Sequence, residues 1–218
     1  MQFKIQRYKR SKRIKIRVSI NGTISVSAPL RTSVAECNNF ILTHMEWIEK
    51  SLQKVKKIQA EILDTRKGMD GKVLYFGKLL NLIIDSSIKK KYLITDDAII
   101  LKGNNLDLFY KTEAKRLFES KCAEIAPFYG IKYGKIRIGA PKTRWGSCSS
   151  SKTLSFNYNL LKAPHGIIEY VVIHELCHII HPNHSRQYWD EVKKLCPDFI
   201  KQRAWLKAHS YELSSEHI

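Results

Sequence analysis

The run HELCHIIHPNH, residues 174–184, constrains this chain more than any other segment. It holds four of the eight histidines of the chain. The residues just before it, 167–173, are mostly Ile and Val, so we expect a largely buried helix to lead into the run. An unpaired polar side chain inside a buried helix is energetically costly. Regularly spaced histidines in such a helix therefore indicate a bound ligand, although they could instead bond to neighbouring backbone groups.

The spacing of the first two histidines predicts a metal site. His174 and His178 are four residues apart, which places both side chains on one face of a helix, one turn apart. Both can therefore reach a single ion. Glu175 would lie beside that ion, where a carboxylate can take a proton from water. This HExxH pattern is typical of zinc-dependent hydrolases, so the sequence predicts zinc as the cofactor and Glu175 as the catalytic base.

His184 is the predicted third ligand. It stands six residues after His178, the spacing of the metzincin pattern HExxHxxGxxH, although His181 occupies the glycine position of that pattern. His181 would lie about 10 Å farther along the helix axis than His174, so one ion could hardly bind both. His181 and a downstream carboxylate such as Glu191 remain rival ligands. If it is not a ligand, His181 could donate to a substrate or lie at the surface.

Hydrophobic periodicity predicts a β-rich N-terminal half with one long helix. Aliphatic residues alternate with polar ones on both sides of Asn21-Gly22, which predicts a β-hairpin closed by a type I′ turn. Over residues 33–62 the apolar spacing changes to three and four, which predicts one long helix. Residues 64–72 are expected to form a loop, and two or three more strands are expected within 73–85 and 92–103.

The C-terminal half is expected to contain short strands between helices. The predicted order is a helix at 107–129, a strand at 135–138, a loop at 141–151, a strand at 154–160, a helix from Ala163-Pro164 through His181, and helices near 185–195 and 198–208. Pro182 is expected to end the histidine helix. A Gly-Asn-Asn run and a change in charge density place a domain boundary near residue 104.

The net charge of +18 is the most unusual feature of the composition. Residues 4–17 hold eight Lys or Arg and no acidic residue. Such a basic surface could attract nucleic acid, nucleotides or an acidic protein. Alternation would place Lys15 and Arg17 opposite the aliphatic residues, so part of this charge could simply be the solvated face of a sheet.

Cysteine usage and hydropathy indicate the compartment. The five cysteines form no CxxC pair and are odd in number, so we expect reduced thiols and no zinc ribbon. No stretch approaches the roughly 18 apolar residues that span a bilayer, and the basic N-terminus lacks the apolar block of a secretory signal. We therefore expect a soluble, cytoplasmic protein with no membrane partner. The sequence does not indicate an oligomeric state.

The segment VVIHELCHIIHPNHSRQYW resembles a known family. With KTRWGSCSSSKTLSFNYNLLKAP before it and LCPDFIKQRAWL after it, it closely resembles the YgjP-like predicted metal-dependent hydrolases, within the WLM/SprT-like group of zincins. The resemblance covers roughly residues 140–208. It implies a metallopeptidase whose metal ligands are His174, His178 and His184, and whose catalytic glutamate is Glu175. The resemblance indicates the metal chemistry more closely than it indicates the substrate.

A polar and aromatic segment before the strand LSFNYNL is the second candidate element. In zincins a sheet packs beside the active-site helix, and its edge strand can pair with an extended substrate. We therefore predict that Trp145, Ser147 and Asn157 form the rim of the cleft, and that Arg144 binds a carboxylate or phosphate. We include His181 among these candidate substrate-binding residues. Alternatively, Trp145 is a core residue and Arg144 pairs with an acid.

Together these features predict an α+β fold in two parts. Residues 1–104 would form a basic, antiparallel, β-rich subdomain with a long helix, and residues 105–218 a zincin-like unit in which a short sheet packs on the HExxH helix. The predicted function is zinc-dependent hydrolysis of a peptide or protein substrate. One alternative is a nucleoside triphosphate pyrophosphatase that uses the same metal. Another is a nucleic-acid-associated binding protein with a structural metal.

Overall fold

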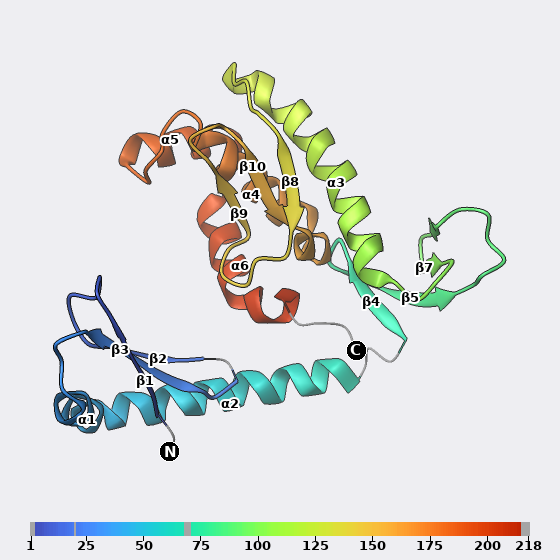
Figure 1. The fold of residues 1–218 in the computed structure, drawn as a ribbon. Helices are drawn as coiled ribbons and strands as arrows, with labels where there is room; N and C mark the ends of the chain where they lie inside the picture. The colour runs from blue at the N-terminus through green and yellow to red at the C-terminus, as the bar shows by residue number, and fades with distance from the viewer. Residues whose placement is uncertain (1–2, 20, 68–70, 215–218) are drawn as a thin grey trace. The chain divides into compact units, whose positions relative to one another are not determined.

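Aliphatic residues at every second position build the first sheet of the protein. The computed structural model describes residues 3–19, 21–67 and 71–214, and divides the chain into two units, Met1–Asp70 and Gly71–Ile218. The first unit contains β1 (Phe3–Tyr8), β2 (Lys15–Val18), β3 (Ile24–Pro29), α1 (Val34–Thr43) and α2 (Met45–Lys67) (Figure 1). Strand β3 lies in the middle, antiparallel to β2 and parallel to β1. The sheet is therefore mixed, because β1 pairs with the free side of the predicted hairpin.

The predicted hairpin is confirmed, but its turn differs from the predicted type. The register pairs Val18 with Ile24, and the Gly22 amide donates to the Ser19 carbonyl at 2.9 Å. A type I′ turn requires positive φ at both Asn21 and Gly22. A two-residue turn at Asn21-Gly22 would pair Ser19 with Ile24, whereas the register pairs Val18 with Ile24, and Gly22 has a φ of 80°. The type I′ prediction is therefore wrong: the loop is longer than two residues and ends in a left-handed glycine.

The predicted long helix is two helices that meet at His44. Ser33 caps α1 in a capping box with Glu36, and His44 caps its C-terminal end. The His44 ring bonds to the Phe40 carbonyl at 2.8 Å, which satisfies a backbone group that the helix end leaves free. Helix α2 continues to Lys67, so the predicted loop at 64–72 begins later, and residues 68–70 lie outside the described residues. The buried cluster between the sheet and the helices of this unit consists of Ile24, Val26, Ile41 and Ile48.

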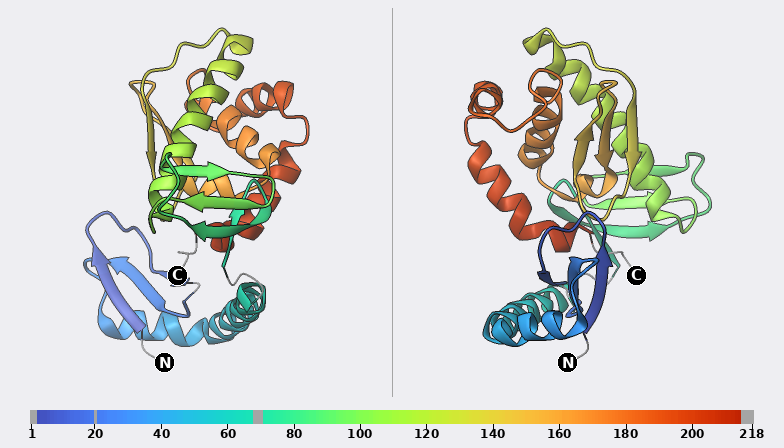
Figure 2. Two further views of the ribbon diagram at one scale, coloured as in Figure 1. Left: turned by 90° about the vertical axis from the view of Figure 1, so that its right-hand side faces the viewer. Right: turned by 60° about the vertical axis from the view of Figure 1, so that its left-hand side comes forward.

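The second unit begins with a sheet that the sequence assigned to the other subdomain. Its strands are β4 (Lys72–Tyr75), β5 (Lys78–Ile84), β6 (Tyr92–Ile94) and β7 (Ala98–Leu101), in the order β4-β5-β7-β6. The left view of Figure 2 brings these four green strands to the front. They give Val73, Leu80, Ile99 and Leu101 to the same buried cluster as the histidine helix. The units consequently divide near residue 70 and not at 104.

A second sheet lies beside the helices of this unit. Its strands are β8 (Ile136–Gly139), β9 (Gly146–Cys148) and β10 (Leu154–Asn157). Helix α3 (Leu106–Ile125) and the 3-10 helix η1 (Ala126–Tyr129) precede them in the chain, and the 3-10 helix η2 (Tyr158–Lys162) follows them. The strand order is β8-β10-β9, so β9 is an edge strand. Phe118 of α3 stacks on Phe156 of β10, with ring centroids 4.4 Å apart. The predicted strand at 154–160 is shorter because Asn157 caps η2.

Three helices complete the unit: α4 (His165–Cys177), α5 (Arg186–Leu195) and α6 (Phe199–Ser214). The regular part of α4 ends at Cys177 and does not reach His181 as predicted. The amides of Ile179 and Ile180 bond to carbonyls three residues back, which tightens the last turn before Pro182. Helix α6 extends beyond its predicted end at residue 208 because Leu213 is buried in the core.

The structure thus confirms the predicted α+β class. All five cysteines are free thiols. In the part of the chain that the structure describes, no helix combines the length and the apolar character that a membrane span requires.

Candidate metal centre

Helix α4 and the tight turn after it position the first two histidines. Their ring centroids lie 5.0 Å apart. Nδ1 of His178 lies 3.2 Å from the His181 carbonyl oxygen. Because a carbonyl can only accept a hydrogen bond, Nδ1 donates the proton and Nε2 of His178 is left as the free ligand atom. The predicted rival ligand His181 therefore contributes its backbone, which orients His178.

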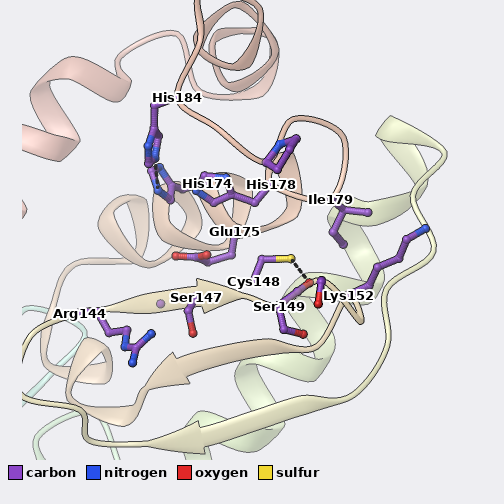
Figure 3. A pocket seen from close by; sticks show the side chains of 13 residues that line it. Arg144, Ser147, Cys148, Ser149, Lys152, His174, Glu175, His178, Ile179 and His184 are labelled. Carbon is purple, nitrogen blue, oxygen red and sulfur yellow. Dashed lines mark hydrogen bonds between the residues drawn. The ribbon is translucent and has the colours of Figure 1, made fainter. Parts of the chain in front are cut away.

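His184 is placed by the helix that follows it. Ser185 caps α5 by accepting a hydrogen bond from the Tyr188 amide at 3.3 Å, which fixes the backbone next to His184. The His184 ring stacks on Trp189 with centroids 5.4 Å apart. Its Nε2 atom lies 3.3 Å from Nε2 of His174 (Figure 3). The chain therefore turns back after α4 and brings the third histidine to the first.

The three histidines fit a zinc ion. Ligand atoms of His174, His178 and His184 all lie within 4.8 Å of one another. Two nitrogens that bind one tetrahedral zinc at about 2.0–2.1 Å lie about 3.4 Å apart, close to the separation of the His174 and His184 nitrogens. Burial and the nearby charges of His178 and His184 lower the pKa of His174 to about 3, and burial also lowers the pKa of His178. Neutral imidazoles are the form that binds metals.

Unpaired buried polar atoms point to the same place. The buried charged or amide side chains of the described residues are Glu113, Asn157, Lys162 and Glu175. The first three have hydrogen-bond partners, among them the hydroxyl of Tyr92 for Glu113. In contrast, Oε2 of Glu175 and Nδ1 of His174 have none. Native proteins rarely leave buried polar atoms unpaired, so this pair indicates a site built for a ligand.

Glu175 lies between the histidines and the edge strand β9 (Figure 3). Its side chain is 4% exposed, and this burial raises its pKa to about 8, while the charge of Arg144 acts in the opposite direction. A Cβ atom at Gly146 would lie 2.7 Å from Cγ and 2.8 Å from Cδ of Glu175. Only a glycine lets strand β9 approach the carboxylate this closely. Sequence reasoning missed this role of Gly146, although its place inside the Arg144–Ser149 segment was the available signal.

A pocket of about 560 Å³ opens over this carboxylate. It is lined by Arg144, Gly146, Ser147, Cys148, Ser149, Ser150, Lys152, His174, Glu175, His178, Ile179, Pro182 and His184. Two of the predicted substrate-binding residues, Arg144 and Ser147, are therefore in the lining. Glu175 is the one acidic residue in this set, whose members all lie in the described part of the chain.

The other predicted substrate-binding residues do not line the pocket. Trp145 packs against the core, and its indole nitrogen donates to the Ser210 hydroxyl at 3.3 Å. The Asn157 amide donates to the Pro141 carbonyl at 3.2 Å, so this side chain holds the loop before β9 in place.

Arg144, which lines the pocket, is exposed, and none of the ion pairs among the described residues includes it.

Tyr188 contacts the cluster of three histidines. It is fully buried, and its hydroxyl donates to the His174 carbonyl at 3.0 Å. Its ring stacks on His178 with centroids 4.7 Å apart. Partners of this kind hold ligand side chains in one orientation and strengthen metal binding.

Known proteins resemble this chain over part or nearly all of its length. The metallopeptidase zymogen of Pyrococcus abyssi abylysin is 22% identical over 46% of this chain and 99% of that chain, with a TM-score of 0.39. The metallopeptidase zymogen of Methanocaldococcus jannaschii jannalysin is 24% identical over 42% of this chain and 96% of that chain, with a TM-score of 0.36. No curated protein sequence matches the chain. Residues 12–209 match the family model described as YgjP-like, metallopeptidase domain, and the chain therefore belongs to the YgjP-like family.

Proposed function

We propose that the chain is a zinc-dependent metallopeptidase with Glu175 as general base. The observation that supports this most directly is the convergence of three histidines beside a buried carboxylate with an unpaired oxygen. A structural zinc usually has four protein ligands. The cluster in the described residues has three, which favours a catalytic metal over the structural metal of a binding protein.

The chain supplies the groups that the reaction requires. His174, His178 and His184 would hold the ion. When bound, zinc supplies Lewis-acid chemistry that polarises a carbonyl group and makes water nucleophilic near neutral pH. Glu175 would accept the proton from that water and pass it to the leaving amine, and burial suits this role by making its carboxylate more basic.

Strand β9 offers a place for an extended substrate. Gly146, Ser147 and Cys148 form the edge of their sheet and line the pocket beside Glu175. A peptide could add to this edge through backbone hydrogen bonds, which binds side chains of many kinds. Arg144 would then attract a carboxylate of the substrate. The five free thiols fit the cytoplasmic peptide or protein substrate that we propose.

Metal analysis tests the ligand set. Purified His184→Ala should contain far less than the one zinc per chain expected of the wild-type protein. His181→Ala is the matched control, and it should retain the metal because its backbone carbonyl still orients His178. Loss of zinc in the control, with full zinc in His184→Ala, would make His181 the third ligand instead.

Substrate assays test the bond that is cleaved. We expect the zinc-loaded protein to degrade denatured casein, and Glu175→Gln to lower that activity by about 10²–10⁴-fold. Hydrolysis of nucleoside triphosphates is a second candidate function, because two cations, Arg144 and Lys152, line the pocket. Activity on triphosphates alone, abolished in Glu175→Gln, would replace the peptidase assignment and keep the base.

A further inference from the structure

Charge in the first unit is divided between the sheet and the helices. Residues 1–35 contain nine Lys or Arg and no Asp or Glu. The first acidic residue, Glu36, lies on α1, and Glu46 on α2 pairs with Lys50. The strands and their connections therefore carry positive charge only, while the acids of this unit begin on its helices.

Strand alternation places Lys4, Lys15 and Arg17 on one face of the sheet, whereas Arg7 falls on the other. The aliphatic side chains of the three strands pack toward α1 and α2 in the core of the unit. The opposite face presents two rows across the strands, set by the register. One row is Lys4, Ser25 and Arg17. The other is Gln6, Ser27 and Lys15.

This basic face, defined by these six residues, is open and not neutralised. Lys4, Gln6, Lys15 and Arg17 are exposed, and the two serines between them are half-buried. None of the ion pairs in the described residues includes its three cations. Ser25 and Ser27 lie on the central strand β3, between the cations of β1 and β2. Because serine is short, their hydroxyl groups lie lower on this face than the longer Lys and Arg side chains beside them. Such a surface offers charge at its sides and hydrogen-bond donors in its middle.

An aromatic side chain and a basic loop extend the basic face at one end. Tyr8 is 49% exposed, and its hydroxyl donates to the Gln6 side chain at 2.6 Å, which places its ring on the same face. The loop that follows holds Lys9, Arg10, Lys12 and Arg13, all exposed. An exposed aromatic ring next to cations is the usual arrangement for stacking a nucleic-acid base beside a bound phosphate.

We propose that the basic face binds single-stranded nucleic acid through its sugar-phosphate backbone. Lys4, Lys15 and Arg17 would contact phosphates, Ser25 and Ser27 would donate to phosphate or sugar oxygens, and Tyr8 would stack on a base. Three strands spaced by about 4.8 Å make a face about 10 Å wide, which suits one strand better than a duplex. The two rows contain no apolar side chain that could insert into a membrane. This inference does not depend on the proposed peptidase activity.

Fluorescence anisotropy of the full chain with a labelled 20-nucleotide oligothymidylate tests the proposal. The wild-type protein should bind it, and the triple variant Lys4→Ser, Lys15→Ser, Arg17→Ser should bind at least about tenfold more weakly. Loss of three phosphate contacts should lower the slope of log affinity against log salt by about 2. Tyr8→Ala should weaken binding by about fivefold or more, because stacking on one base contributes about 1–3 kcal/mol.

A matched control separates a specific face from net charge. Lys132→Ser, Lys135→Ser, Arg137→Ser removes the same charge from exposed positions of the second unit and should leave affinity within about twofold. Equal loss of affinity in both triple variants would overturn the proposal, as would absence of binding by the wild-type protein at low salt. Tighter binding to polyglutamate or to phosphatidylserine vesicles than to the oligonucleotide would also overturn it. Circular dichroism checks that each variant is folded.

Discussion

The two units differ in whether they bury charged side chains. In the second unit, Glu113, Lys162 and Glu175 are buried, and burial shifts the pKa values of the last two. Among the described residues of the first unit no charged side chain is buried. Exclusion of water strengthens electrostatic interactions and changes proton affinity, as a catalytic centre requires. Exposure instead suits long-range attraction of a polyanion, which salt weakens.

The buried cores of the two units also differ in size. The second unit has one large cluster that joins both of its sheets to α3, α4 and α6. The buried cluster of the first unit is much smaller, with four residues among those described. Changes in the second unit should therefore be costly and reach the metal centre, whereas changes in the first should be small or local.

The largest expected effect is loss of core packing in the second unit. Phe118 is fully buried and stacks on Phe156 of β10, the strand that pairs with β9. We expect Phe118→Ala to lower the free energy of unfolding by about 3–5 kcal/mol and to lower zinc content. Amide hydrogen exchange should show faster exchange throughout the second unit. Faster exchange of α4 in Ile48→Ala, a core change in the first unit, would break the comparison.

The next effect concerns the approach of β9 to Glu175. In Gly146→Ala the added methyl group would occupy space held by the Glu175 side chain, so the carboxylate must move. A misplacement of about 1 Å can cost about 100-fold in rate, and we expect a loss of that order in casein hydrolysis with normal zinc content. Gly103→Ala is the control, since nothing lies within 4 Å of a Cβ atom there. Full activity of Gly146→Ala would show that the contact is not required.

A third prediction concerns pH and the buried Lys162, whose ammonium donates to the Leu213 carbonyl at 3.1 Å. Burial lowers its pKa from 10.5 to about 8. Between these values the unfolded chain binds more protons than the folded one, so this group makes stability rise with pH. From pH 7 to 9.5 the wild-type protein should gain roughly 2 kcal/mol relative to Lys162→Met, measured by urea unfolding.

The matched control for this pH effect is Lys54→Met. Lys54 is an exposed lysine of α2, so its ammonium stays in water in both states and the difference from wild type should not change with pH. The difference in unfolding free energy between the wild-type protein and Lys162→Met could also prove independent of pH. In that case burial of this ammonium does not make stability depend on pH, and Lys162 no longer distinguishes the second unit from the first.

The smallest expected effect lies in the first unit. Ser33→Ala removes the capping box of α1 and should destabilise that helix by about 0.5–2 kcal/mol. Hydrogen exchange should accelerate at the start of α1 only, and casein activity should stay unchanged. Ser33→Asp should restore protection, because aspartate also caps helices. A loss of zinc in Ser33→Ala would contradict the independence of the two units.

Two hairpins show where sequence prediction succeeded and failed. Asn21-Gly22 predicted a type I′ turn that the structure does not have. Phe76 and Gly77, which follow Tyr75 and precede its strand partner Lys78, do have two positive φ values, 50° and 77°. The reason is tertiary: their amides donate to carbonyls of η2, at Leu161 and Lys162. Contacts with another element therefore decided the turn type, and no local preference indicated them.

The sequence by itself determined the parts of the site that depend on helix geometry. The spacing of His174, Glu175 and His178 requires only 3.6 residues per turn, and alternation in residues 14–28 requires only a strand. Tertiary structure decided the rest. His184 depends on the cap of α5, and Glu175 depends on a glycine in a strand that precedes it by many residues. Local periodicity is a property of a segment, whereas convergence depends on how segments pack, which the sequence does not show directly.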